Sequence, residues 1–144
     1  MNILRMNASM PAAAAVLAAG AVVAGSACRA ADEPAAAQVK PVIAEKLPNV
    51  PGKTLTAVVV SYAPGGKSAK HRHAGSVFAY VLSGAIRSEN SATGPARVYK
   101  AGESFFEPPG SEHLVSENAS ATEPASLLAV FVADDGAQLT TYGK

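Results

Sequence analysis

Two histidines separated by a single residue, His71 and His73, constrain this chain more than any other feature of its sequence. On an extended strand, residues i and i+2 project from the same face, so both imidazoles would lie within reach of one metal ion. Neutral imidazole is the commonest protein ligand of transition metals. The chain has three histidines in all, and the third, His113, must come from a distant strand folded back beside the first. Ordinary surface or hydrogen-bonded histidines are the alternative interpretation.

Glycine, proline and histidine recur around these positions at fixed spacings. The first segment reads Gly65-x5-His71-x-His73-x3-Val77-x6-Gly84. The second reads Gly102-x5-Pro108-x-Gly110-x2-His113-x3-Glu117, and Asn118 follows one place later. In this order the two segments resemble the two sequence motifs of the cupins, which read G-x5-H-x-H-x3-E-x6-G and G-x5-P-x-G-x2-H-x3-N. The resemblance covers roughly Leu55 to Val132, and the chain departs from it at the motif glutamate and at the motif asparagine.

This resemblance implies an all-β fold, the double-stranded β-helix of a small bacterial single-domain cupin, which is a jelly-roll-like barrel with a metal site inside its mouth. It implies His71, His73 and His113 as metal ligands and puts Val77 where the fourth ligand, a glutamate, is usual. Because valine cannot coordinate, three nitrogens would leave the charge of a divalent ion uncompensated and positions open for water or substrate. Some three-histidine cupins bind iron(II) and activate oxygen, whereas a weaker, often empty site is the other consequence. The sequence does not distinguish among Fe, Mn, Zn, Ni and Cu as the bound metal.

Three glutamates near the second motif, Glu107, Glu112 and Glu117, are candidates for acid–base catalysis. Glu107 and Glu112 lie closest to the turn of the motif, where a carboxylate can accept a proton or hold an imidazole. Counting by twos from His113 puts Val115 and Glu117 on the same inward face, provided that no bulge intervenes. Glu117 would still lie ~13 Å along the strand, too far to share one metal. A solvated carboxylate at the barrel rim is the competing interpretation for each of the three.

Short apolar and β-branched runs separated by glycine and proline predict strands, and no helix outside the N-terminal leader. The expected strands are 42–47, 54–62, 76–88 with a bend or turn at Gly84, 97–100, 104–107, 113–116 and 125–133. Residues 138–142 read either as a last strand or as a frayed tail. Residues 90–95 read as a loop by composition.

The strand expected over 76–88 also predicts a molecular surface. If Val77 points inward, alternation puts Ala79 and Val81 inward with it, which makes the pocket floor small and apolar. The residues between and after them, Phe78, Tyr80 and Leu82, then lie on the opposite face. Cupin barrels commonly pair across this face, so we expect a homodimer that buries it.

Residues 1–31 resemble an export signal, with Arg5 near the start, an uncharged run rich in alanine and valine, and small residues after it. Cleavage after Ala30 would place the mature protein in the periplasm or outside the cell. The segment 25–28 is a degraded lipoprotein box, so a lipid anchor at Cys28 is the alternative. A retained membrane span is less favoured, because the run is short and alanine drives insertion weakly. Residues 32–38 read as a flexible tether and 39–144 as the cupin domain.

Length, charge and cysteine content limit the remaining function classes. A chain of 144 residues has room for one domain with one core. A formal net charge of +1 gives no electrostatic support for binding to nucleic acid or to an anionic membrane. A single cysteine, Cys28, excludes a disulfide within the monomer and makes thiol catalysis unattractive.

These observations leave three functional hypotheses. The first is an exported metalloenzyme of the dioxygenase or isomerase type, acting on a small organic acid or phenolic compound. The second is a non-catalytic cupin that binds or senses a small ligand and whose metal is structural or absent. The third, a structural or partner-binding protein of the cell envelope, has support only from the leader. Because the architecture carries many unrelated activities, the sequence does not decide whether the chain is an enzyme.

Overall fold

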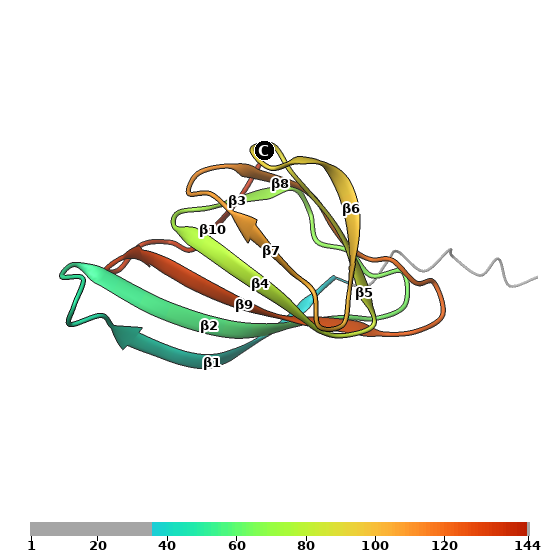
Figure 1. The fold of residues 1–144 in the computed structure, drawn as a ribbon, viewed down its shortest axis with the longest axis horizontal. Helices are drawn as coiled ribbons and strands as arrows, with labels where there is room; N and C mark the ends of the chain where they lie inside the picture. The colour runs from blue at the N-terminus through green and yellow to red at the C-terminus, as the bar shows by residue number, and fades with distance from the viewer. Residues whose placement is uncertain (1–35, 144) are drawn as a thin grey trace, which may run out of the picture. The chain divides into compact units, whose positions relative to one another are not determined.

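The computed structural model describes residues 36–143, and in this part of the chain ten strands form two antiparallel sheets (Figure 1). The first sheet has the strand order β1-β2-β9-β4-β7, and the second has the order β10-β3-β8-β5-β6. In Figure 1, β1, β2, β9 and β4 run along the lower layer, while β3, β8 and β10 lie above them. The prediction of an all-β fold is therefore confirmed for the described residues.

The strands agree closely with the runs predicted from the sequence. They are β1 (Gln38–Lys46), β2 (Lys53–Tyr62), β3 (His71–His73), β4 (Ser76–Ser83), β5 (Ala85–Asn90), β6 (Gly94–Lys100), β7 (Ser104–Glu107), β8 (Glu112–Asn118), β9 (Ala125–Asp134) and β10 (Thr140–Tyr142). The C-terminal segment is a strand rather than a frayed tail, because β10 pairs with β3. The loop expected over 90–95 is wrong at both ends, since β5 extends to Asn90 and β6 begins at Gly94.

The long strand expected over 76–88 is two strands, because Gly84 turns the chain from one sheet into the other. Gly84 has a φ of 68°, which L side chains rarely adopt. A Cβ atom at this position would also lie 2.6 Å from the carbonyl oxygen of Pro124. Both the conformation and the space therefore require glycine at the point where β4 ends and β5 begins.

The core lies between the two sheets and is built by strict alternation on β4 and β9. Val77, Ala79 and Val81 of β4 are fully buried, whereas Phe78 and Leu82 are each 46% exposed. This confirms the predicted division of the strand into an inward and an outward face. The other buried apolar residues packed into this core are Val58, Tyr62, Ile86, Ala125, Leu127, Ala129 and Phe131.

Strand β8 contains a bulge. Asn90 of β5 pairs with His113, but the preceding residue Glu89 pairs with Val115, so Leu114 is an extra residue on β8. Such a bulge moves every later side chain to the other face of the strand. The alternation of inward and outward side chains that is predicted by counting from His113 therefore fails after Leu114.

The buried residues that follow His113 on β8 are therefore Ser116 and Asn118, and not Val115 and Glu117. The expectation that Val115 and Glu117 face inward is wrong for this reason. The same bulge explains why the asparagine of the second motif stands one place late. The extra residue in the strand brings Asn118 to the inward face that the motif asparagine would otherwise occupy.

The leader predicted over 1–31, including Cys28, and the first part of the tether lie outside the described residues. The described part begins with Ala36, which forms an isolated bridge with Lys67, and β1 starts at Gln38. Within residues 36–143, no helix is long and apolar enough to cross a membrane.

Candidate metal centre

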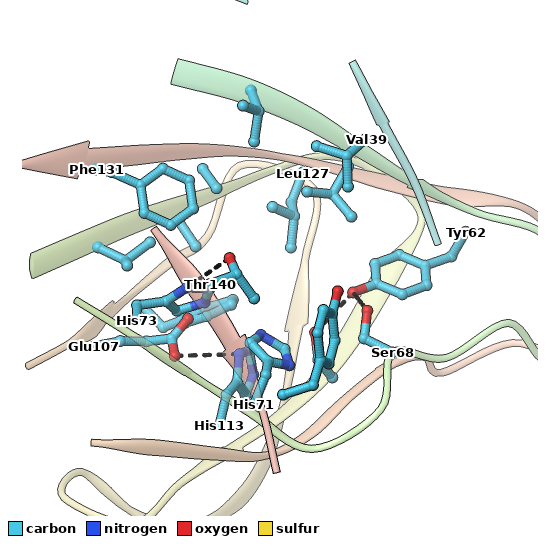
Figure 2. Close-up of a pocket in the computed structure, with 18 residues that line it drawn as sticks. Val39, Tyr62, Ser68, His71, His73, Glu107, His113, Leu127, Phe131 and Thr140 are labelled. Carbon is cyan, nitrogen blue, oxygen red and sulfur yellow. Dashed lines mark hydrogen bonds and ion pairs between the residues drawn. The ribbon is translucent and has the colours of Figure 1, made fainter. Parts of the chain in front are cut away.

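The three histidines converge between the sheets, as expected from their spacing. β3 is paired with β8, and this pairing sets His71 directly opposite His113. One ring nitrogen from each of His71, His73 and His113 lies within 4.8 Å of the other two. All three side chains are buried, at 7%, 7% and 4% exposure (Figure 2). A buried cluster of three imidazoles at this spacing could bind a metal ion.

Backbone carbonyl groups fix the orientation of two of the rings. Nδ1 of His71 donates to the carbonyl oxygen of Ala69 at 2.7 Å, and Nδ1 of His73 donates to that of Leu139 at 3.1 Å. A carbonyl oxygen can only accept, so Nδ1 carries the proton in both neutral rings and Nε2 keeps its lone pair. The hydroxyl of Thr140 also lies 3.2 Å from Nδ1 of His73, so two consecutive residues, Leu139 and Thr140, contact the same ring nitrogen. The free nitrogens have the form that binds a metal.

Burial keeps the imidazoles of His71 and His73 neutral. It lowers the pKa of His71 and the pKa of His73, because the charged ring loses its hydration, and the neighbouring His113 lowers both further. Hydrogen bonds to the backbone carbonyls oppose this effect without reversing it. Since only the unprotonated nitrogen coordinates a metal, His71 and His73 need no deprotonation at neutral pH.

The third ring has one nitrogen without a hydrogen bond. Nε2 of His113 lies 2.9 Å from the hydroxyl of Ser88, but the buried Nδ1 has no hydrogen-bond partner. Oε2 of Glu107 is 3.1 Å from this Nδ1, yet it is not aligned as an acceptor. Leaving a buried polar atom unpaired costs about 1–3 kcal/mol. A cation bound at this point would satisfy it, so the donor set fits a metal site.

Glu107 differs from what the sequence predicts. It is 3% exposed, so the interpretation as a solvated rim carboxylate is wrong. The reason is its position on β7, where it pairs with the inward-facing Val77 of β4. Nδ2 of Asn90 donates to its Oε2 at 3.1 Å. Burial pushes the pKa of Glu107 up, but contact with His113, the nearby His73 and the Asn90 amide outweigh it and lower the pKa.

The other two glutamates do not reach the histidine cluster. Glu112 accepts from Arg72 at 2.6 Å on the outward face of the paired strands β3 and β8, and this guanidinium lowers the pKa of the Glu112 carboxyl. Glu117 faces outward because of the bulge and lies 3.4 Å from the guanidinium of Arg87. Both are surface ion pairs, so neither is placed to exchange a proton at the imidazoles.

A cavity of about 90 Å³ opens beside the three imidazoles. Val39, Leu127 and Phe131 line its apolar side, and Figure 2 shows them across from the histidines. Its wall also has a polar corner, where the buried hydroxyl of Tyr62 lies near two serines. The cavity can therefore hold a small molecule with an apolar body and a polar group at each end.

The polar corner consists of Tyr62, Ser68 and Ser116. The Tyr62 oxygen lies 2.7 Å from Oγ of Ser116 and 3.0 Å from Oγ of Ser68. Burial raises the pKa of the Tyr62 hydroxyl, so it remains a neutral donor or acceptor at physiological pH.

Sequence reasoning missed four polar residues of this region: Ser68, Ser88, Asn90 and Ser116. Two of them carry a signal that could have been used, because counting by twos from the buried Ile86 of β5 leads to Ser88 and Asn90. Reading residues 90–95 as a loop hid this alternation. Ser116 could be found only with knowledge of the bulge, and Ser68 lies between strands where no periodicity applies.

The sequence matches the family model of the Cupin domain over residues 58–131, which is more than half of the chain. No curated protein sequence matches it. Among solved structures, a cupin-like protein from Thermotoga maritima MSB8 is 20% identical, with a TM-score of 0.58, covering 74% of this chain and 75% of that protein.

Two enzymes of known structure are also similar. An oxalate oxidase in complex with the substrate analogue glycolate is 21% identical, with a TM-score of 0.58 over 77% of this chain. The DMSP lyase DddQ from Ruegeria pomeroyi DSS-3 is 22% identical, with a TM-score of 0.53 over 61% of this chain. The chain spans 57% of the oxidase and 42% of the lyase, so at this identity the likeness shows the fold alone. Together, the matched family model, the two-sheet fold and the two motifs show that the chain belongs to the cupin family.

Proposed function

We propose that this chain is an exported cupin that binds one divalent metal through His71, His73 and His113 and acts as a dioxygenase- or isomerase-type metalloenzyme. The observation that carries the proposal is the cluster of three buried imidazoles beside a small cavity, with one ring nitrogen of each within 4.8 Å of the others. Three nitrogen ligands leave coordination positions for a substrate. When bound, a divalent metal supplies Lewis acidity or a place for dioxygen and substrate to meet.

The size and lining of the cavity favour a small organic substrate with an oxygen-rich end. Its apolar walls and its volume of about 90 Å³ suit a short carbon skeleton or a single ring. The Tyr62 hydroxyl provides a hydrogen-bonding partner for a second polar group. An anionic or chelating group would complement the positive charge of a divalent ion bound at the three histidines. The oxalate oxidase of similar fold was solved with glycolate, itself a small acid, and this agrees with the proposed substrate class.

The catalytic proposal is tested with protein purified without a histidine tag and loaded separately with Fe²⁺, Mn²⁺, Ni²⁺, Cu²⁺ or Zn²⁺. Oxygen consumption and product formation are measured with catechols, keto acids and short hydroxy acids. We expect turnover with at least one pair of metal and substrate, and at least about 100-fold less with His73→Ala. Turnover that is unchanged in His73→Ala would contradict the proposed site.

One observation favours the second candidate function, a non-catalytic cupin that binds or senses a small ligand. Val77 is 1% exposed and lines the cavity, so β4 brings no carboxylate to the histidines. In a binding cupin, the same panel of compounds would raise the melting temperature without being consumed. Stabilisation by a compound that is recovered unchanged from every metal-loaded form would favour this function over catalysis.

Export and dimerisation complete the proposal. The leader predicted over 1–31 supports a periplasmic or secreted protein, or a lipid-anchored one if Cys28 is modified, and N-terminal sequencing of the mature protein distinguishes these. The outward face of β4 supports a homodimer, because Phe78, Tyr80 and Leu82 are 46%, 39% and 46% exposed. Phe106 of the adjacent β7 continues this apolar surface at 50% exposure.

A further inference from the structure

Glu107 places a buried carboxyl group beside the three histidines. Its side chain is 3% exposed and lines the cavity that they share. Among the described residues, its ion pair is with His113, and no lysine or arginine pairs with it. An ionised carboxylate is costly to bury unless a cation or several hydrogen bonds compensate it. The amide of Asn90 supplies one such bond, at 3.1 Å.

The imidazole beside this carboxylate does not fully compensate it either. Oε2 of Glu107 lies 3.1 Å from Nδ1 of His113, but the two atoms are not aligned for a hydrogen bond. When Nε2 of His113 donates to Ser88, Nδ1 carries a lone pair that faces a carboxylate oxygen. In that tautomer, two electron-rich atoms lie 3.1 Å apart in a buried place, and a positively charged ion between or beside them would stabilise both.

The pairing of β7 with β4 places Glu107 next to the position where a carboxylate is missing. Val77 and Glu107 are direct partners across β4 and β7, and both face the cavity that the histidines line. Paired residues on one face of a sheet have Cβ atoms about 4.5–5.5 Å apart, so either position can bring a carboxylate to nearly the same place. The carboxylate that is missing at Val77 is therefore present on the neighbouring strand.

We propose that Glu107 is the carboxylate ligand of this metal centre, provided from β7 across from Val77. The inference rests on the proposed binding of a metal by the three histidines. In the structure Oε2 of Glu107 contacts both His113 and Asn90, and the flexible side chain of glutamate lets Oε1 move toward the ring nitrogens while Oε2 stays with Asn90. The metal would then have three nitrogen ligands and one carboxylate oxygen ligand. The negative charge of the carboxylate lowers the net charge of the metal centre and strengthens metal binding.

The test is a double-substitution cycle at positions 107 and 77, with Co²⁺ as the probe. Affinity is measured by competition with a chelator, and the visible spectrum of bound Co²⁺ reports the ligand set. Glu107→Gln keeps the size of the side chain and an oxygen for Asn90 but removes the charge, so we expect at least about tenfold weaker binding and an altered spectrum. Glu112→Gln, at a solvated carboxylate near the site, is the matched control and should leave affinity within about twofold.

The cycle separates direct coordination from a role exerted through His113. If Glu107 is a ligand, Val77→Glu tightens binding at least about tenfold more in the Glu107→Gln background than in the wild-type protein, because the wild-type ion already has its carboxylate. Equal gains in the two backgrounds would overturn the proposal, since a partner acting only on His113 is not replaced from position 77. Wild-type affinity in Glu107→Gln would overturn it as well.

Folding and the parent proposal are controlled separately. Thermal unfolding of the metal-free variants shows whether Glu107→Gln folds, and if it does not, Val77→Glu alone in the wild-type background decides. If Val77→Glu raises the Co²⁺ affinity of the otherwise wild-type protein about tenfold or more, the ion had no carboxylate ligand before the substitution. That result would contradict the inference. Failure of the wild-type protein to bind Co²⁺ removes the histidine site itself. Wild-type binding that His73→Ala abolishes and Glu107→Gln leaves unchanged removes only the role of Glu107.

Discussion

Replacing Asn118 with alanine tests the bulge that sets the register of β8 and so the position of His113. The Asn118 side chain is buried and makes three hydrogen bonds to the backbone: Nδ2 donates to the carbonyls of Ala63 at 3.0 Å and Glu123 at 2.7 Å. Its Oδ1 accepts from the amide of Ser120 at 2.9 Å. It therefore ties the end of β8 to the loops before β3 and before β9.

The expected cost follows from these contacts. A net contribution of about 1 kcal/mol for each hydrogen bond gives about 3 kcal/mol for the three. The carbonyl of Ala63 keeps a second donor, the amide of Gly66 at 2.9 Å, which reduces the loss at that group. We therefore expect Asn118→Ala to lower the free energy of unfolding by about 2–3 kcal/mol. In a domain of this size that corresponds to a melting temperature roughly 10–20 °C lower.

The assay is urea unfolding of the metal-free protein followed by circular dichroism, with Glu117→Ala as the control. Glu117 stands where the sequence motif places its asparagine, but here it faces outward and makes an exposed contact with Arg87. Its replacement should change the free energy of unfolding by less than about 0.5 kcal/mol. If Glu117→Ala costs more than Asn118→Ala, β8 has no extra residue at Leu114 and the inferred register is wrong.

Three further predictions follow from the structure. The metal-free protein should lose stability to urea as the pH falls from about 7 to about 5, because the lowered folded-state pKa values of His71 and His73 let the unfolded chain bind more protons below about 6.5; stability that rises on acidification would contradict this. If the proposed homodimer forms through the outward face of β4, Phe78→Glu should convert it to a monomer in light scattering after gel filtration, whereas Val98→Glu, at a 50% exposed residue of the other sheet, should not; two variants that both remain dimeric would exclude the β4 face. Gly75→Ala should cost about 1–3 kcal/mol in thermal unfolding, because a Cβ there would overlap the backbone of β9 next to Ala133; an unchanged melting temperature would show that this approach is looser.

The sequence predicts the strands from local regularities and the meeting of the histidines from the spacing of two motifs. Apolar runs that end at glycine or proline mark where strands stop, and a period of two fixes which side chains share a face. The division of β4 into buried Val77 and exposed Phe78 follows from this period alone. The convergence of His73 and His113 is a long-range property, and it was reached through the spacing of two family motifs.

The sequence does not predict the remainder because it depends on irregular or tertiary features. No residue type predicts the bulge at Leu114. The residue is extra only in comparison with the residues of β5, the strand with which β8 pairs. Glu107 reads as a rim carboxylate because glutamate is rarely buried, and only the pairing of β7 with β4 shows that it faces the cavity. Asn90, its hydrogen-bond donor, is the last residue of β5, whereas the composition of residues 90–95 predicts a loop there.

The central claim is that His71, His73 and His113 hold one metal ion between the two sheets. The most direct measurement is elemental analysis of the protein purified without a histidine tag, in parallel with the three single His→Ala variants. The account predicts close to one equivalent of a divalent metal in the wild-type protein and less than about one tenth of that in each variant. Equal metal content in the wild-type protein and the variants would contradict it.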